Sequence, residues 1–425
     1  MHLFLWADDS ETELRAELAQ AFREGLLAGE PALTPPPERG HSCPQQAPQT
    51  QIVTPIPKPR GTSSIAVDRN VRPPGAPFAT ADFTLVPGQR LPCFAFARQW
   101  LPNSRAAQAE SIQGWAHELF EAVTGGLPDT QPWSLHIEPC YGARATHRIG
   151  ARAWHSVTRR GATVPARAEA DGDRPHPEAG RHRCRLIREA VIELLRKKRR
   201  HLLRQLRNDP APFSTSDSLI QFLLTAPNMG FISLAVAPVP FEQRHLLSPF
   251  PKGEVPVTWD KAAPSRALAK LLEAELRLGR SIQPGETCVD LGASPGSWTY
   301  LAVGRGARVI AVDRSALRAD LMLNRQVQFH AQDAFRFEPT QPADWLLCDV
   351  LAVPERTSDL LLEWLRRRWC RHFVMTLKLK DTGGADVLAH LKRALPPLTS
   401  EFFLTRLCAN KKELCVFGSA SSSLS

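Results

Sequence analysis

The chain has 425 residues, of which 43% are hydrophobic and 23% charged, and its formal net charge is +10. This length predicts two or three domains, and the composition excludes a wholly disordered, collagen-like or membrane-embedded chain. The 37 prolines indicate a long linker. The basic balance favours polyanionic partners but does not specify a fold.

The first segment, 1–28, is predicted to form a strand at 2–6 and a helix at 10–27, with Ser10 and Glu13 as a capping box. The start lacks the basic region and the long apolar run of a signal peptide. No apolar run in the chain approaches the roughly 20 residues needed to span a bilayer. We therefore expect a cytoplasmic protein that does not engage a membrane.

The next two regions differ sharply in composition. Residues 29–77 are rich in Pro and Gln and carry no sustained period, which predicts a linker or an irregular insertion. Residues 78–240 alternate strand-like and helical segments, which predicts an α+β domain. The expected elements are strands near 82–86, 94–100 and 134–139, a helix near 107–124, and two strands between 218 and 237. The Arg-, Ala-, Gly- and Pro-rich stretch 143–180 is expected to be an exposed excursion.

A strongly basic stretch at 181–207 carries nearly all of the excess charge. It holds eleven basic and two acidic residues, a net charge of +9. Its aliphatic residues recur every three to four positions, which predicts a helix. Five consecutive basic residues, Arg196, Lys197, Lys198, Arg199 and Arg200, are candidates for contacts with RNA phosphates. A solvated helix face and a helix lying on an anionic membrane are the alternatives.

The region 254–417 predicts an α/β doubly wound sheet, because strand-like and helical segments alternate along it. A helix is expected at 264–278, and the polar tail 418–425 is expected to be flexible. The nine cysteines include no C-x2-C pair. Buried free thiols are therefore expected, and no metal site.

The densest chemical signal is the segment DLGASPGSW at 290–298, which follows a predicted strand. Glycines in such a turn let backbone N–H groups approach a ligand at the carboxyl edge of the sheet. The segment matches neither the dinucleotide fingerprint nor the phosphate-binding P-loop. Asp313, Asp333 and Asp349 follow the next strands, so we expect them to converge with Asp290 on one crevice. Asp313 could hold a ribose diol and Asp333 an adenine amino group, although an acid after a strand also commonly caps a helix.

The order of these motifs resembles the FtsJ-like S-adenosylmethionine-dependent RNA 2′-O-ribose methyltransferases. The resemblance spans about 264–417 and implies a Rossmann-like fold and a Lys-Asp-Lys-Glu catalytic tetrad. Its members here are Lys270 in the motif Ser265–Glu273, Asp349, Lys378 and Glu413. The resemblance also implies a set of cofactor-binding residues: Ala267, Asp290, Gly292, Ser294, Pro295, Gly296, Ser297, Trp298, Asp313, Asp333 and Asp349.

Further segments resemble bacterial 23S rRNA 2′-O-methyltransferases whose N-terminal half contains a THUMP-like RNA-binding region. They are FAFARQW, TAPNMGFISLAVAP, SPFPKG and WCRHFVMTLKLK. This resemblance implies 23S rRNA or its precursor as the partner and a cytidine 2′-hydroxyl as the target. The insertion 29–77 and the stretch 143–180 depart from the family. So does Ser297, which stands where the family usually has a glycine that adopts a positive φ without cost.

The resemblance implies a direct methyl transfer in which Lys378 removes the proton of the ribose hydroxyl. A lysine acts as a base only when neutral, so we expect burial and the nearby cation Lys270 to lower the pKa of Lys378. Asp349 and Glu413 would orient the two amines. Two alternatives remain: a methyltransferase for another RNA or a small molecule, and a catalytically inactive RNA-binding relative.

Overall fold

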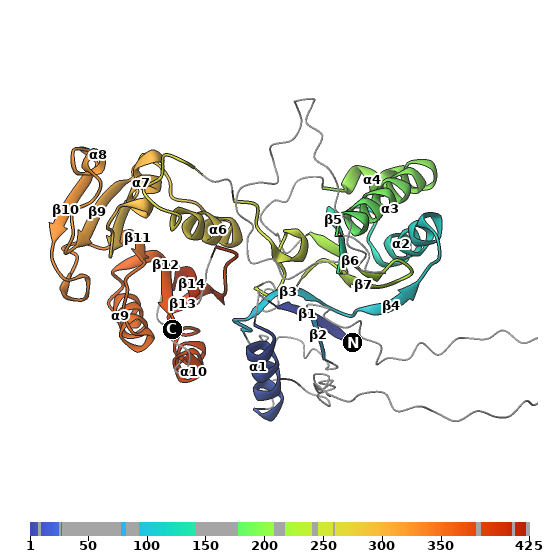
Figure 1. The fold of residues 1–425 in the computed structure, drawn as a ribbon, viewed down its shortest axis with the longest axis horizontal. Helices are drawn as coiled ribbons and strands as arrows, with labels where there is room; N and C mark the ends of the chain where they lie inside the picture. The colour runs from blue at the N-terminus through green and yellow to red at the C-terminus, as the bar shows by residue number, and fades with distance from the viewer. Residues whose placement is uncertain are drawn as a thin grey trace, which may run out of the picture.

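The computed structural model describes most of the chain, in segments. The segments are 1–6, 10–24, 27, 78–81, 93–140, 177–207, 217–239, 245–257, 260–379, 384–409 and 413–421. The predicted linker 29–77, the predicted strand 82–86, residues 143–176 and the end of the tail lie outside them. The described residues form three sheets, of three, four and seven strands (Figure 1).

The seven-stranded sheet lies in the C-terminal half and has the order β10-β9-β8-β11-β12-β14-β13. Its strands are β8 Thr287–Leu291, β9 Arg308–Asp313, β10 Val327–Ala331, β11 Ala343–Cys348, β12 Cys370–Lys378, β13 Thr399–Thr405 and β14 Glu413–Ala420. The strands from β10 to β12 are parallel, and β14 runs antiparallel to both of its neighbours. The predicted α/β doubly wound sheet is confirmed, and its topology is Rossmann-like.

Helices cover both faces of this sheet, which explains why its central strands are almost entirely apolar. The helical segments are α6 Leu268–Leu278, α7 Ser297–Gly304, α8 Ala319–Met322, η2 Ala334–Arg336, α9 Pro354–Arg366 and α10 Gly384–Ala394. The helices α6 and α7 share one apolar core, and α9 and α10 share the other (Figure 1). The chain runs outward from β8 to β10 and then returns to the other side of β8 as β11. In open α/β sheets the ligand-binding crevice lies at such a reversal, outside the carboxyl ends of the two strands, which here are β8 and β11.

A small antiparallel sheet, β2-β1-β3, holds the N-terminus. Its elements are β1 His2–Trp6, β2 Phe78–Ala81 and β3 Ala97–Leu101, and the helix α1, Glu11–Arg23, follows β1. The predicted capping box is wrong, because the Ser10 side chain makes no capping hydrogen bond. Instead Arg406 Nη1 donates to Ser10 Oγ at 2.7 Å. Since Arg406 directly follows β13, this bond ties the start of α1 to the seven-stranded domain.

The four-stranded sheet, β4-β7-β6-β5, forms an α+β region with helices packed on it (Figure 1). Its elements are β4 Arg105–Gln108, β5 Trp133–Pro139, β6 Ser218–Ala226, β7 Met229–Ala235, α2 Ile112–Gly126, α3 Pro177–Lys198 and α4 Arg200–Gln205. Ile187, Val191 and Leu195 of α3 are fully buried against this sheet and α2. The basic stretch was predicted as one helix but forms two, because Arg199 leaves the helical conformation (φ −145°, ψ 59°).

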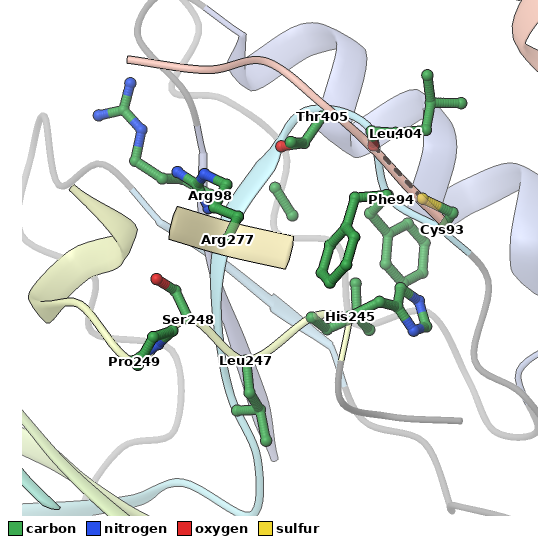
Figure 2. A pocket seen from close by; sticks show the side chains of 13 residues that line it. Cys93, Phe94, Arg98, His245, Leu247, Ser248, Pro249, Arg277, Leu404 and Thr405 are labelled. Atoms are coloured by element: carbon green, nitrogen blue, oxygen red, sulfur yellow. Dashed lines mark hydrogen bonds between the residues drawn. The ribbon is translucent and has the colours of Figure 1, made fainter. Parts of the chain in front are cut away.

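A connecting segment at 245–257, which contains the turn η1, Pro251–Gly253, joins the N-terminal sheets to the seven-stranded domain. A pocket of about 30 Å³ lies there, lined by residues of both halves that include Arg98 and Arg277 (Figure 2). Among the described segments, no helix is long and apolar enough to cross a membrane. All eight described cysteines are free thiols, and seven are buried; Cys43 lies outside the described residues.

Candidate active site

The four residues of the predicted tetrad lie together and form a closed ring of ion pairs. Lys270 Nζ lies 3.0 Å from Asp349 Oδ2 and 2.6 Å from Glu413 Oε1. Lys378 Nζ lies 2.6 Å from Asp349 Oδ1 and also contacts Glu413 Oε2. Each ammonium therefore contacts both carboxylates, and each carboxylate contacts both ammonium groups. The side chains are between 10% and 23% exposed, so the ring is largely shielded yet open to a ligand.

Four separate elements bring these residues together. Lys378 ends β12 and stands directly opposite Glu413, the first residue of the antiparallel strand β14. Asp349 immediately follows β11, which pairs with β12 on its other side. Lys270 lies in the first turn of α6. The register of three neighbouring strands and one covering helix thus fixes the ring.

The electrostatics of the ring correct one prediction. Burial lowers the pKa of Lys378, but Asp349 and Glu413 outweigh burial and raise that pKa to about 12. The expectation that Lys270 would lower the pKa of Lys378 is therefore wrong, because both carboxylates lie closer to the amine than a second cation can. Burial raises the pKa of Asp349, but Lys270 and Lys378 outweigh it, and the net shift is downward. Two amines and two carboxylates alternate around the ring, so their formal charges balance.

A fifth residue, Thr376, belongs to the site and was missed in the sequence. Its hydroxyl donates to Asp349 Oδ1 at 2.5 Å. Thr376 lies two positions before Lys378 on β12, so both side chains are on the same face of the strand. That two-residue spacing was the signal available in the sequence, and it places a hydroxyl donor on Asp349, one of the two carboxylates that both lysines contact.

The turn after β8 brings the backbone close to the crevice. Gly292 has φ +74°, and a Cβ there would lie 2.6 Å from Val350 Cγ1. Gly296 has φ +109° and precedes α7. Ser297 is already the first residue of that helix, so the serine is not at one of the positive-φ positions. The missing family glycine therefore carries no conformational cost at Ser297.

Three residues predicted to surround the cofactor have buried side chains that build the turn. Asp290 is fully buried and accepts from Thr299 Oγ1 at 2.6 Å, and burial raises the pKa of Asp290 to about 7. Ser297 Oγ lies 2.7 Å from Ser265 Oγ. Trp298 packs in the core, and its Nε1 donates to Ala267 O at 2.7 Å. All three side chains thus have partners within the protein, and their contact with a cofactor stays a prediction.

The remaining strand-end carboxylates have different surroundings. Asp313 accepts from the backbone N–H groups of Ser294 at 3.0 Å and Ser315 at 2.8 Å, one on each oxygen. A carboxylate has about four acceptor positions, so two remain for a ligand. Asp333 caps η2 through the N–H of Phe335 and pairs with Arg314 at 2.5 Å. The N–H of Phe335, followed by Arg314, lowers the pKa of Asp333.

The predicted RNA-binding residues form an exposed group apart from this crevice. All five residues from Arg196 to Arg200 are exposed, at the end of α3 and the start of α4. Glu193 pairs with Arg196 and, at 3.3 Å, with Lys197. The helices α3 and α4 lie in the opposite half of the molecule from the seven-stranded sheet (Figure 1). The two predicted functional regions are therefore separate surfaces.

Comparison with known proteins agrees with the motif analysis. Residues 263–390 match the family described as FtsJ-like methyltransferase. A protein of Xylella fastidiosa (strain M12) named ribosomal RNA large subunit methyltransferase M is 35% identical over 157 residues, covering 36% of this chain and 40% of its own. Proteins of the same name from Laribacter hongkongensis and Halorhodospira halophila are 38% and 34% identical, covering 33% and 40% of this chain and 42% and 50% of their own. The matched part of the chain thus spans at most half of these relatives' length.

Proposed function

We propose that the chain methylates a ribose 2′-hydroxyl in large-subunit rRNA, with S-adenosylmethionine as the methyl donor; the match of residues 263–390 to the FtsJ-like methyltransferases supports this. The specific target would be a cytidine of 23S rRNA or of its precursor. The observation that carries this proposal is the closed ring of Lys270, Asp349, Lys378 and Glu413 at the carboxyl edge of the sheet. A ring of this kind suits a reaction at an alcohol, because an alcohol is a poor nucleophile until a base removes its proton.

The residues at the crevice fit the proposed cofactor. S-adenosylmethionine, when bound, supplies an electrophilic methyl group on a positively charged sulfur. Asp313 keeps two acceptor positions for ribose hydroxyls, and Asp333 offers carboxylate oxygens to an adenine amino group. The backbone of the turn from Gly292 to Gly296, which includes Ser294 and Pro295, can approach a ligand closely because both glycines have positive φ.

Lys378 is the proposed general base. Its amine must first lose a proton, and from a pKa of about 12 only about one molecule in 10⁴ has the neutral amine at pH 8. The rare neutral amine is a strong acceptor for the hydroxyl proton. Asp349 and Glu413 then hold the ammonium that forms, and Lys270 keeps both carboxylates in place. The ribose oxygen would take the methyl group as its bond to the cofactor sulfur breaks and leaves a neutral thioether, and the hydroxyl proton would pass to the neutral Lys378 Nζ.

The exposed basic residues Arg196–Arg200 would hold the RNA backbone, and the N-terminal α+β region would act as a THUMP-like RNA-binding domain. Phosphate contacts supply affinity without sequence choice. These residues lie in the other half of the molecule from the ring (Figure 1). A ligand that engages both must be large, which favours a folded RNA over a small molecule. The proposed domains are 78–240 for RNA binding and 254–417 for methyl transfer.

The direct test uses purified protein, S-adenosylmethionine with a tritiated methyl group, and rRNA that lacks the modification. Transferred label should survive alkaline hydrolysis in a dinucleotide, because a 2′-O-methyl group blocks cleavage of the next phosphodiester. Lys378→Ala should abolish transfer, and Lys261→Ala, at an exposed lysine outside the ring, should not. Label in base-hydrolysable mononucleotides, or none at all with wild-type protein, would contradict the proposal.

A further inference from the structure

A buried ion pair lies beneath the tetrad on α6, and the mechanism above does not use it. Glu273 is fully buried, and the Arg277 side chain is only 8% exposed. Arg277 Nε and Nη2 donate to Glu273 Oε1 at 3.0 and 2.8 Å. Removing one member of such a pair leaves an uncompensated buried charge. Glu273 follows Lys270 by three residues, so the glutamate of the pair lies less than one helical turn from a member of the tetrad.

The other contacts of this pair reach two more segments. Glu273 Oε2 accepts from the backbone N–H of Ala409 at 3.3 Å, and Ala409 precedes Glu413 by four residues in the chain. Arg277 Nη2 donates to the backbone oxygen of Gly253 at 2.7 Å, in the turn that leads back to the N-terminal sheets. One buried pair therefore binds the helix of Lys270, the approach to Glu413 and the joint between the two halves.

Gly253 is itself fixed against the N-terminal half. It has φ +70°, and a Cβ there would lie 2.2 Å from the backbone oxygen of Arg98 in β3. The turn can therefore approach β3 this closely only with glycine. Arg98 and Arg277 both line the pocket at this joint (Figure 2). The packing of Gly253 against β3 thus fixes the position of its backbone oxygen. The hydrogen bond from Arg277 links this oxygen to α6.

We propose that Glu273 and Arg277 are positioning residues, which hold Lys270 and Glu413 in register and couple the tetrad to the seating of the N-terminal half. This inference rests on the proposed function of the tetrad. Neither residue touches the reacting atoms. Loss of the pair should move Lys270 relative to Asp349 and Glu413, and a displacement of about 1 Å at a catalytic group can lower the rate about 100-fold.

The test compares Arg277→Met, Arg277→Lys and Gly253→Ala with Arg280→Gln, which removes a partly exposed ion pair with Glu286 at the end of the same helix. In the methylation assay, Arg277→Met and Gly253→Ala should lower kcat by about tenfold to 100-fold, with KM for RNA changed by less than about threefold. Arg277→Lys keeps the charge and should be intermediate. Arg280→Gln should match wild type. Wild-type kcat in folded Arg277→Met, or an effect on KM alone, would overturn the proposal.

A second readout does not require activity. Lysine amines are labelled with limiting acetic anhydride and quantified by mass spectrometry, with the exposed Lys261 as the internal reference. Lys270 should react several-fold faster in Arg277→Met and Gly253→Ala than in wild type, since its carboxylate partners are no longer in register. Unchanged labelling of Lys270 would reject the positioning role. If wild-type protein transfers no methyl group but the labelling changes, the proposed function fails while the coupling stands.

Discussion

In the seven-stranded domain, the four charged residues of the candidate site are largely buried and each contacts two opposite charges. On α3 and α4, five consecutive basic residues are exposed, with Glu193 as a neighbour of two of them. The first arrangement gives a ring with no net charge, whereas the second gives a surface that attracts polyanions at a distance. The two arrangements suit different roles. The ring suits the transfer of one proton, and the basic helices suit binding to the phosphate backbone of a nucleic acid.

The largest effect should come from the ring. Lys378→Ala removes the proposed base and should lower kcat by at least about 10³-fold, within the range of a general base in an oriented site. Lys378→Arg is the matched control, because arginine keeps the positive charge but does not give up its proton. Both variants should be inactive in the tritium assay, and cofactor affinity should stay within a few-fold. Substantial activity in Lys378→Arg would make the role of Lys378 electrostatic.

The pH dependence should separate the ring from the surface. The pKa of Lys378 is raised to about 12, so the neutral amine becomes more abundant as pH rises. We expect kcat to increase about tenfold per pH unit between about pH 6.5 and 9.5, without a plateau. A plateau that begins near pH 7.5 would mean that another group with a lower pKa accepts the proton. RNA affinity should change little over this range, since the reference pKa values of arginine and lysine side chains lie above it.

Salt should weaken RNA binding by the basic helices, whereas kcat at saturating RNA should not depend on these helices. Replacing Lys197, Lys198, Arg199 and Arg200 with Gln should weaken RNA binding by about tenfold or more at low salt. It should also make the slope of log K against log salt shallower by about 2 to 3, as phosphate contacts are lost. Fluorescence anisotropy with an rRNA fragment measures both. kcat at saturating RNA should be retained, and an unaltered salt slope would reject the RNA-binding role of this surface.

The smallest of these effects should be at the cofactor. Asp313→Ala should weaken S-adenosylmethionine binding by about tenfold, since it removes hydrogen bonds to a ribose worth roughly 1–2 kcal/mol. Isothermal titration calorimetry provides the measurement, and Asp320→Ala, at an exposed carboxylate paired with Arg318, is the control. Equal affinity for Asp313→Ala and wild type would exclude the assigned contact.

The sequence predicted the seven-stranded sheet well because its strands are short apolar runs separated by helical periods. The tetrad was predicted only through the family resemblance. Hydrophobic periodicity alone could not predict the contact between Lys270 and Glu413, because the two residues are far apart in the chain. They meet where α6 packs near β14, the antiparallel strand inserted between β12 and β13. The pKa direction of Lys378 was wrong for the same reason, because it depends on which carboxylate lies within hydrogen-bonding distance.

Local signals failed where tertiary contacts compete with them. Ser10 has the residue type of a helix cap, yet its hydroxyl accepts from Arg406, far along the chain. The basic stretch kept its predicted apolar period but breaks into two helices at Arg199. Trp298 packs in the core, and its indole N–H donates to Ala267 O, a partner that the sequence did not indicate. In each case the sequence gives the chemistry of the side chain but not its partner.

In the proposed function, the ring of four charged residues serves the methylation of one ribose of large-subunit rRNA. Its most direct test is to delete the gene in the organism that carries it, map 2′-O-methyl groups across the rRNA, and complement with wild type or Lys378→Ala. We predict that one large-subunit methyl group disappears on deletion, returns with wild type and stays absent with Lys378→Ala. An unchanged rRNA methylation map in the deletion strain, or restoration of the lost group by Lys378→Ala, would contradict the account.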